Sequence, residues 1–303
     1  MYQINFYRIH KLQKLYSTVS ADSVASKHPG LMGANKMSDT PWQYLELNRE
    51  GRVLEVRFRA HNAHNSLSNA LMRELTQLAG ELQYDSELNA IILTGANDIF
   101  SAGMDLKDPE LAAAGTLSLA QQRQLVKVGP AMCAAWEALE PITIAAIEGW
   151  CIGGATALAC ACDWRVAADN ASFYVPELKL GMNMSWQSVP RFNHLIGPSK
   201  TKQLLILAQP LDAGTCKDWG LFDYITAPGA AMDKARDLAN QVAAMPPVPV
   251  RMAKRAVTVS ASALDHAVSY MDADQFLLTQ GTEDAIEGAM AFFEKREATF
   301  KGN

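Results

Sequence analysis

Two adjacent glycines and one glutamate form the residue set in this chain with the clearest potential for chemistry. Gly153 and Gly154 separate an apolar segment from a run of small residues, and Glu177 follows in the segment SFYVPELKLGM. If a helix begins at the glycines, its first N–H groups are free and lie at the positive end of the helix dipole. Glycine also lets a ligand approach the backbone closely. The pattern predicts an anion site beside a carboxylate, with a tight strand-to-helix connection as the alternative.

The elements that would position this site are two buried strands. Residues 143–147 form a short apolar run, which is typical of a strand buried on both faces. A second strand is predicted at residues 90–94, followed by a glycine-containing turn at 101–104, after which Asp105 is expected to cap the next segment. If the two strand ends lie side by side, one N–H from each can point at a single oxygen, as in an oxyanion hole.

Four segments carry a resemblance to a known family. The strings FSAGMDLK, IAAIEGWCIGGATALACACDWRVAADNASFYVPELKLGM, DAGTCKDWGLFDYI and FFEKREATFKGN resemble the crotonase superfamily, which comprises enoyl-CoA hydratases, enoyl-CoA isomerases and their relatives. The matching segments occur in the family's order from about residue 42 to residue 300. The resemblance implies an α/β fold, a crotonase-like spiral of repeated ββα units with a C-terminal helical region.

The resemblance also implies a ligand and a set of site residues. The ligand would be an acyl-CoA thioester, and no separate cofactor is expected because CoA is part of the substrate. The backbone N–H groups of Met104 and Gly154 would bind the thioester oxygen and stabilise an enolate, where one such donor is typically worth roughly 3 to 4 kcal/mol. Glu177 would be the acid/base. The substrate-binding and CoA-binding residues would be Ala63, Ala102, Asp105, Leu106, Lys107 and Gly153.

One departure from the family pattern determines which reaction we expect. Standard hydratases carry two glutamates, whereas this chain has Ala157 at the first position and Glu177 at the second. A single carboxylate can move a proton from one carbon to another, so the pattern is similar to that of the Δ3,Δ2-enoyl-CoA isomerases. Hydratase-lyases of the feruloyl-CoA type also lack the first glutamate, so hydration or retro-aldol chemistry is the alternative. A crotonase-fold protein that only binds is a third hypothesis. Ser185 stands where dienoyl-CoA isomerases and aryl-CoA dehalogenases place an aspartate, which argues against both.

Large apolar side chains around the glycines and the glutamate are candidates for an acyl pocket. They are Trp150, Met182, Met184 and Trp186. Apolar surroundings would raise the pKa of Glu177 and make it a better base near neutral pH. The segment MNMSWQS leaves less open space than the Gly-rich loop of other family members. The pattern therefore favours an unusual substrate whose acyl group is apolar and not charged, with or without a ring.

The composition agrees with an enzyme that has one large core. The chain has 303 residues, is 49% hydrophobic and 19% charged, and carries a net charge of −5, so nucleic acid and membrane are not expected partners. The five cysteines form no disulfide framework. Cys160 and Cys162 would point apart on a helix, and His61 with His64 lacks a third ligand, so no metal site is predicted.

The chain is predicted to divide into three parts. Residues 1–36 are basic and serine-rich and resemble a disordered or targeting extension, residues 37–245 form the spiral core, and residues 246–303 form the C-terminal helical part after a PPVP break. A cytoplasmic location is expected, or a mitochondrial one if the extension is a transit peptide. The resemblance further implies a homotrimer or hexamer.

Overall fold

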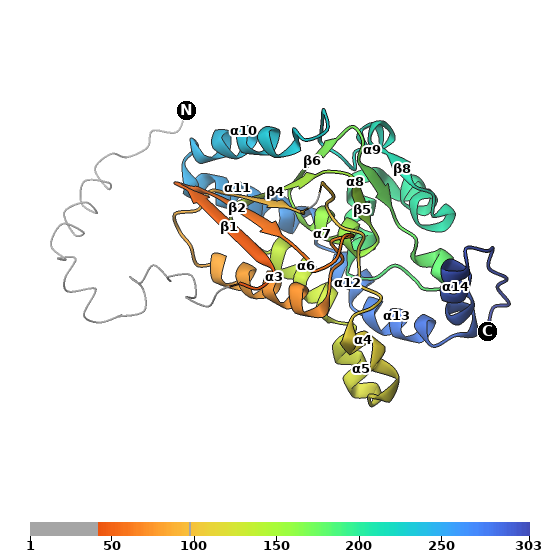
Figure 1. The fold of residues 1–303 in the computed structure, drawn as a ribbon. Coiled ribbons are helices and arrows are strands. Elements are labelled where there is room, and N and C mark those ends of the chain that lie inside the picture. Colours follow the sequence, from red (N-terminus) through yellow and green to blue (C-terminus); the bar gives the residue numbers. More distant parts are fainter. Residues whose placement is uncertain (1–41, 97) are drawn as a thin grey trace, which may run out of the picture.

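The fold is organised around a six-stranded sheet. The computed structural model describes residues 42–96 and 98–303, so the extension predicted at residues 1–36 lies outside the described residues. The strand order is β1-β2-β3-β4-β6-β9, and every pair except the antiparallel hairpin β1–β2 is parallel. The strands are β1 (Leu45–Glu50), β2 (Val53–Phe58), β3 (Ala90–Thr94), β4 (Ile142–Ile147), β6 (Trp164–Ala168) and β9 (Tyr224–Thr226). In Figure 1 the labelled strands β1, β2, β4 and β6 of this sheet lie in the half of the molecule away from the C-terminus.

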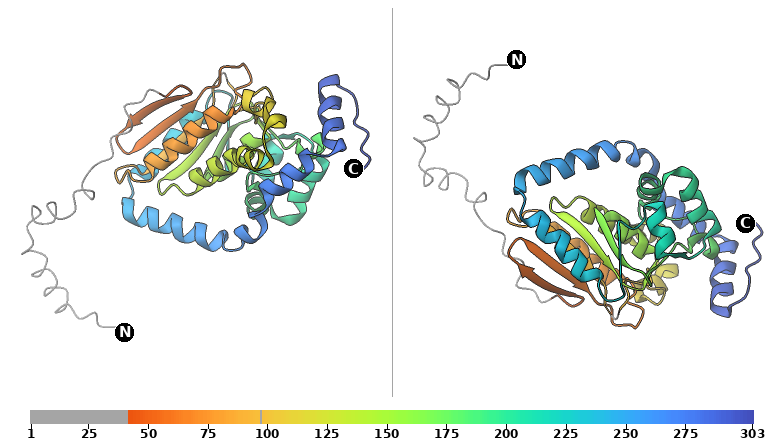
Figure 2. Two further views of the ribbon diagram at one scale, coloured as in Figure 1. Left: turned by 90° about the horizontal axis from the view of Figure 1, so that it is seen from below. Right: turned by 90° about the horizontal axis from the view of Figure 1, so that it is seen from above.

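The central strands β3 and β4 are buried on both faces of the sheet. Alternate side chains of a strand point to opposite faces, and here each face packs into its own core cluster. In β3, Ile91 and Leu93 belong to one core cluster and Ala90 and Ile92 to the other. Helices α3 (Asn69–Leu82), α6 (Val128–Glu137) and α7 (Gly154–Ala161) contribute to the first cluster, and α10 (Ala231–Ala243) contributes to the second. Figure 2 views the sheet from both sides, with α3 (orange) over it in one view and α10 (cyan) over it in the other.

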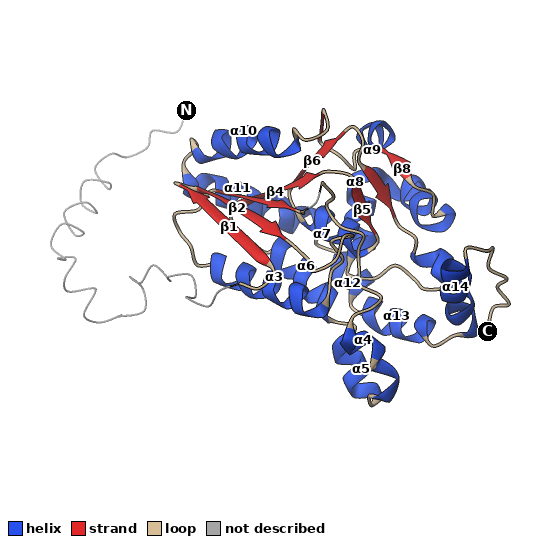
Figure 3. Ribbon diagram, viewed as in Figure 1, coloured by secondary structure: helices blue, strands red, loops and turns tan. Residues whose placement is uncertain are grey.

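A second, smaller sheet makes the repeat of the fold visible. It contains β5 (Trp150–Ile152), β7 (Ser172–Tyr174) and β8 (Leu211–Asp212) in that order. The chain leaves the large sheet at the end of β4, enters the small one as β5 and continues as α7, and it passes from β6 to β7 in the same way. This succession of ββα turns, with helices around the strands (Figure 3), confirms the predicted architecture.

The remaining helices lie between the strands and in the last third of the chain. They are α4 (Pro109–Ala112), η1 (Ala114–Thr116), α5 (Leu119–Leu125), η2 (Glu177–Leu180), α8 (Ser188–Lys202), η3 (Gln203–Leu207), α9 (Ala213–Trp219), α11 (Pro247–Ala261), α12 (Asp265–Ser269), α13 (Asp272–Gln280) and α14 (Glu283–Glu294). The C-terminal part is helical, as predicted, whereas its assignment as a separate part beginning at residue 246 stays a prediction.

The helices α3 and α4 both begin with a side-chain cap. Ser68 caps α3, since its hydroxyl oxygen accepts the N–H of Leu71 at 3.2 Å. Asp105 does not cap the next helix. Asp108 does, because its carboxylate accepts the N–H groups of Glu110 and Leu111 at the start of α4. Asp105 instead accepts the N–H of Lys107 at 3.0 Å within the preceding turn, which leaves its other carboxylate oxygen near the loop after β2.

All five cysteines are buried thiols. Burial raises the pKa of Cys133 and Cys162 to about 12 and that of Cys160 to about 11, and it raises the pKa of Cys151 and Cys216 as well. Within the described ranges, no cluster of three His, Cys, Asp or Glu side chains is placed to hold a metal ion. In the same part of the chain, no helix combines the length and the apolar character needed to cross a membrane.

Candidate active site

The segments that follow β3 and β5 lie side by side, as the oxyanion-hole hypothesis requires. Ser101 and Cys151 form a parallel bridge, with the N–H of Ser101 donating to the Trp150 carbonyl at 2.8 Å and the N–H of Ile152 donating to the Ser101 carbonyl at 3.1 Å. Gly103 has φ +84°, and a Cβ at that position would lie 3.2 Å from the nitrogen of Gly154. Only glycine fits this close approach of two backbones.

The first free donor in this region is the N–H of Met104. Its neighbours on both sides are engaged, since Gly103 N–H donates to Ser101 Oγ and Asp105 N–H donates to the carbonyl of Leu67, both at 3.0 Å. For Met104 N–H no acceptor is found among the described residues. The parallel bridge between Leu67 and Met104 holds this segment in place, so the donor is fixed and available to a ligand.

The second donor is the N–H of Gly154. Gly154 is the first residue of α7, where an N–H group has no acceptor inside the helix. The preceding Gly153 adopts φ +54° and ψ −124°, a conformation that residues other than glycine rarely adopt, and its N–H donates to the Tyr174 carbonyl at 2.8 Å. This turn points the start of α7 at the junction with the 101–105 segment. The N–H groups of Met104 and Gly154 therefore border the same space.

Glu177 supplies a buried carboxyl beside this pair of donors. It begins the short helix η2, and its Oε2 atom is buried without a hydrogen-bond partner among the described residues. A Cβ at Gly153 would lie 2.9 Å from Glu177 Oε1, so the carboxyl lies directly against the glycine turn. Burial raises the pKa of Glu177 to about 7, and a hydrogen bond from its own backbone opposes the shift only in part. Such a carboxyl exchanges a proton readily near neutral pH.

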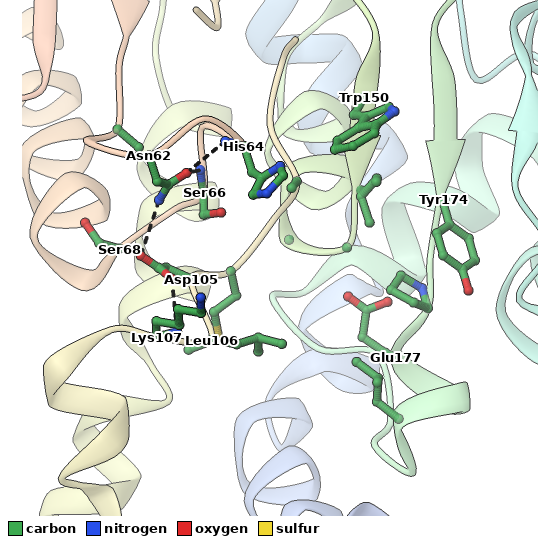
Figure 4. A pocket seen from close by; sticks show the side chains of 18 of the residues that line it. Asn62, His64, Ser66, Ser68, Asp105, Leu106, Lys107, Trp150, Tyr174 and Glu177 are labelled. Atoms are coloured by element: carbon green, nitrogen blue, oxygen red, sulfur yellow. Dashed lines mark hydrogen bonds between the residues drawn. The ribbon is translucent and has the colours of Figure 1, made fainter. Parts of the chain in front are cut away.

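A cavity of about 800 Å³ joins these groups. On one side it is lined by polar residues from the loop after β2 and from the 102–109 segment, namely His61, Asn62, His64, Ser66, Ser68, Asp105 and Lys107. On the other side it is lined by apolar residues from η2, the segment after it and helices α13 and α14, namely Leu180, Met182, Met184, Trp186, Phe276, Phe292 and Phe293. Figure 4 shows Glu177 across the open space from Asp105 and Lys107. The cavity can hold a ligand with one polar and one apolar end, with the free N–H groups and the carboxyl between them.

Comparison with known proteins agrees with this geometry. The family model described as enoyl-CoA hydratase/isomerase matches residues 48–303. The chain belongs to the enoyl-CoA hydratase/isomerase family. It is 31% identical to the short-chain-enoyl-CoA hydratase of Clostridium acetobutylicum over 83% of this chain and 95% of that protein. It is 32% identical to the carnitinyl-CoA dehydratase of Escherichia coli O157:H7 over 85% of this chain and 98% of that protein. A crystal structure of an enoyl-CoA hydratase from Bacillus anthracis has 30% identity and a TM-score of 0.68, and it covers 86% of this chain and 100% of the other.

Most residues predicted for CoA binding line the cavity of this hydratase/isomerase family member. They are Ala102, Asp105, Leu106, Lys107 and Gly153. Ala63 differs, because it is exposed and does not line the cavity, whereas its neighbours Asn62 and His64 do. The Asn62 side-chain oxygen accepts the N–H groups of His64 and Ser66, both at 3.1 Å, and so shapes this polar rim.

The residues predicted for the acyl pocket separate into two groups. Met182, Met184 and Trp186 line the apolar side of the cavity. Trp150 lies at the rim, where the residue is 45% exposed and its ring stacks on His64 with a centroid distance of 5.8 Å. Trp150 therefore belongs to the polar rim and not to the apolar wall. Ser185 places a buried hydroxyl on that apolar wall, beside the carboxylate of Asp272.

Ala157 has no acid/base group that could take the place of the first glutamate of standard hydratases. It is fully buried in α7, belongs to the core and does not line the cavity. Tyr174 is the titratable residue whose pKa responds to the Glu177 charge. Burial raises the Tyr174 pKa and the Glu177 charge raises it further, so its phenol stays protonated near neutral pH. Glu177 is therefore the group beside the two donors whose pKa suits acid/base work.

Sequence reasoning missed several residues that line the cavity. Tyr44, Tyr174, Phe276, Phe292 and Phe293 come from the start of the described chain, from β7 and from the last two helices. The string FFEK contains Phe292 and Phe293 and contributed to the resemblance, but it carries no signal that α14 turns back onto η2. That contact depends on Gly288, where a Cβ would lie 2.6 Å from the Leu180 carbonyl carbon.

Proposed function

We propose that this chain is an enoyl-CoA isomerase, in which Glu177 moves a proton along the acyl chain while the N–H groups of Met104 and Gly154 hold the thioester oxygen. The observation that carries the proposal is the single buried carboxyl with a pKa of about 7, next to the glycine turn and without a second carboxylate at Ala157. The polar rim, with the Lys107 ammonium, would receive the CoA, and the apolar wall would receive the acyl group.

The proton transfer needs one base that becomes one acid. The Glu177 carboxylate takes a proton from C2 of a 3-enoyl-CoA, and the C–H electron pair moves through the thioester onto its oxygen. The two N–H donors stabilise this dienolate, because they are fixed before charge develops on the oxygen. Protonated Glu177 then delivers the proton to C4, the double bond settles between C2 and C3, and the carboxylate is restored. A pKa near the working pH makes both half-reactions accessible. We propose that no cofactor takes part besides the CoA of the substrate.

Hydration is the second candidate, and the names of the relatives favour it. The Clostridium acetobutylicum relative is named a short-chain-enoyl-CoA hydratase and the Syntrophomonas wolfei relative, 30% identical over 86% of this chain, a crotonyl-CoA hydratase. In this reaction Glu177 would take a proton from water as the water oxygen attacks C3, and would return that proton to C2. One carboxylate would then serve as base and acid in succession.

One labelling experiment distinguishes the candidates. The protein is incubated separately with 3-hexenoyl-CoA and 2-hexenoyl-CoA in deuterated water, and the products are identified by mass spectrometry and NMR. Isomerisation predicts interconversion of the two thioesters with deuterium at C2 or C4. Accumulation of 3-hydroxyhexanoyl-CoA would instead show that the protein catalyses hydration. If neither substrate changes and the Glu177→Gln variant behaves like the parent toward every acyl-CoA tried, the assignment of chemistry to this site is wrong.

A further inference from the structure

The indole ring of Trp186 lies in a slot between two helices, and a glycine forms each side of that slot. A Cβ added to Gly129 of α6 would collide with the ring at Cε2, and a Cβ added to Gly154 of α7 would collide with it at Cη2. Gly129 lies within a helix at a negative φ, where other residues are favoured on backbone grounds. The indole ring of Trp186 explains why residue 129 is a glycine, since any side chain would occupy the space of the ring.

The backbone that carries the ring is held in an unfavourable conformation. Trp186 has φ +60° and Gln187 has φ +56°, which is rare for residues other than glycine. Arg191 stabilises this turn by donating from Nη1 to the Trp186 carbonyl at 2.9 Å and to the Gln187 carbonyl at 3.1 Å. Its Nε and Nη2 pair with the Glu137 carboxylate, both at 2.8 Å, and the N–H of Gln187 donates to Asp272. Elements α6, α8 and α13 together fix the indole.

Because the indole ring borders the cavity, its position limits the space that is open to a ligand. Trp186 lines the cavity but is only 8% exposed, so most of the ring fills the slot and only part of its surface faces a ligand. Gly154, which forms one side of the slot, also provides the N–H that borders the reacting end of the ligand. Without the ring, the cavity would continue between α6 and α7 from this point, since neither glycine has a side chain to close it.

We propose that Trp186 determines the length of the acyl group that the cavity accepts, by closing the slot between Gly129 and Gly154. The inference rests on the proposed acyl-CoA function. The acyl chain is directed along Met182 and Met184 toward the phenylalanines of α13 and α14, and its length is limited by that space. Removal of the indole adds a second apolar branch to the cavity, which longer chains can enter.

Two substitutions test this in opposite directions. Trp186→Gly opens the slot and suits the positive φ at this position, so the turn keeps its preferred backbone. Gly129→Ala adds one methyl group that pushes the indole toward the cavity, although alanine by itself favours a helix interior. Affinities are measured by calorimetry with saturated acyl-CoAs from butanoyl-CoA to hexadecanoyl-CoA, which cannot isomerise or add water. Trp186→Gly should raise the affinity for long chains relative to short ones by about tenfold or more, because two additional buried methylenes suffice for that gain. Gly129→Ala should lower it.

Trp150→Gly is the matched control, because it removes an indole from the rim of the same cavity. It should change the affinity for all chain lengths by the same factor. Unchanged length preference in both Trp186→Gly and Gly129→Ala would overturn the inference while leaving the proposed function intact. If Trp186→Gly fails to fold, Gly129→Ala decides alone: an unaltered preference contradicts the proposal. Failure of the parent protein to bind any acyl-CoA would remove the proposed function and this inference together.

Discussion

The Glu177 carboxyl lies directly against Gly153, so closely that a Cβ on residue 153 would be 2.9 Å from Oε1. The glycine thus serves two purposes. It allows the turn that starts α7, and it leaves room for the carboxyl beside the Gly154 N–H. The proposed acid/base and one of the two proposed donors are thus positioned by the same turn.

Gly153→Ala should therefore impair activity more than stability. The added methyl group displaces the carboxyl, and a misplacement of about 1 Å can cost about 100-fold in rate. The positive φ should cost about 1 to 3 kcal/mol of stability. Gly51→Ala is the control, since Gly51 has φ +57° with nothing within 4 Å and lies in the β1–β2 hairpin. The control should lose similar stability and keep its kcat/KM. Equal activity losses in both variants would show that contact with Glu177 is unimportant.

Glu177→Gln should reduce kcat by about 100-fold to 10,000-fold, the range that a positioned acid/base usually contributes. In the parent protein, kcat/KM for a 3-enoyl-CoA should rise with pH through the Glu177 pKa of about 7, because the ionised form removes the first proton. The variant should lose this rise. A pH profile that is the same in the parent and the variant would contradict the role of Glu177 as the base.

The same residue should make stability depend on pH. Burial raises the pKa of Glu177 in the folded protein from 4.5 to about 7, so the folded state binds this proton more tightly than the unfolded state. The stability contribution of the protonated carboxyl is fully present below about pH 4.5 and is lost as the pH rises through about 7. The complete loss amounts to about 3 kcal/mol. Urea unfolding of the parent and of Glu177→Gln at several pH values measures it: the variant's advantage should grow between about pH 5 and pH 8. A constant difference would mean that the carboxyl is not buried.

Ala157→Glu should not convert the protein into a two-glutamate hydratase. Ala157 is fully buried and does not line the cavity, so a carboxylate there would be an unpaired buried charge that costs about 3 kcal/mol or more. Ala157→Gln, which adds the same volume without charge, separates crowding from ionisation. Denaturant midpoints and the rate of 2-enoyl-CoA hydration are the measurements. A stable Ala157→Glu protein with a large gain in hydration rate would show that only this one residue is missing from a standard site.

Arg191→Lys should destabilise the protein and disturb the turn at Trp186. Lysine cannot form the paired bonds to Glu137 while also donating to the carbonyls of residues 186 and 187. Because Arg191 is buried, the loss should be about 3 to 5 kcal/mol, whereas Arg73→Lys in the exposed pair with Glu110 should change stability little. Thermal unfolding gives the stabilities, and tryptophan fluorescence reports the indole environment. Similar small effects in both variants would exclude a bracing role for Arg191.

The sequence was informative where a short pattern determines a local structure. The apolar runs predicted β3 and β4, and the glycines at 153 and 154 marked the strand-to-helix turn. The resemblance supplied the order of the ββα units. The choice of Asp105 as a cap was wrong because two aspartates follow Gly103 and a turn intervenes, so that Asp108 starts the helix.

The rest of the site depends on contacts between distant segments, which no local pattern encodes. In the sequence Gly129 looks like an ordinary helix residue, and only the structure places the ring of Trp186 against it. Phe276 likewise fits the pattern of an amphipathic helix, and only the structure shows that it lines the cavity. The burial of the Glu177 carboxyl was expected from its apolar neighbours. Its contact with Gly153 follows only from the fold.

The burial of all five cysteines makes thiol chemistry a direct measure of how often this protein opens. In the native fold each sulfur is covered and its thiolate is disfavoured, so an alkylating reagent can react only after a segment separates from the core. Cys133 lies in α6, Cys151 in β5 and Cys216 in α9, and each would report the opening of its own surroundings. Mass spectrometry of alkylated peptides, followed over time with and without an acyl-CoA, would therefore resolve which layers of the spiral separate first and which of them a bound thioester holds closed.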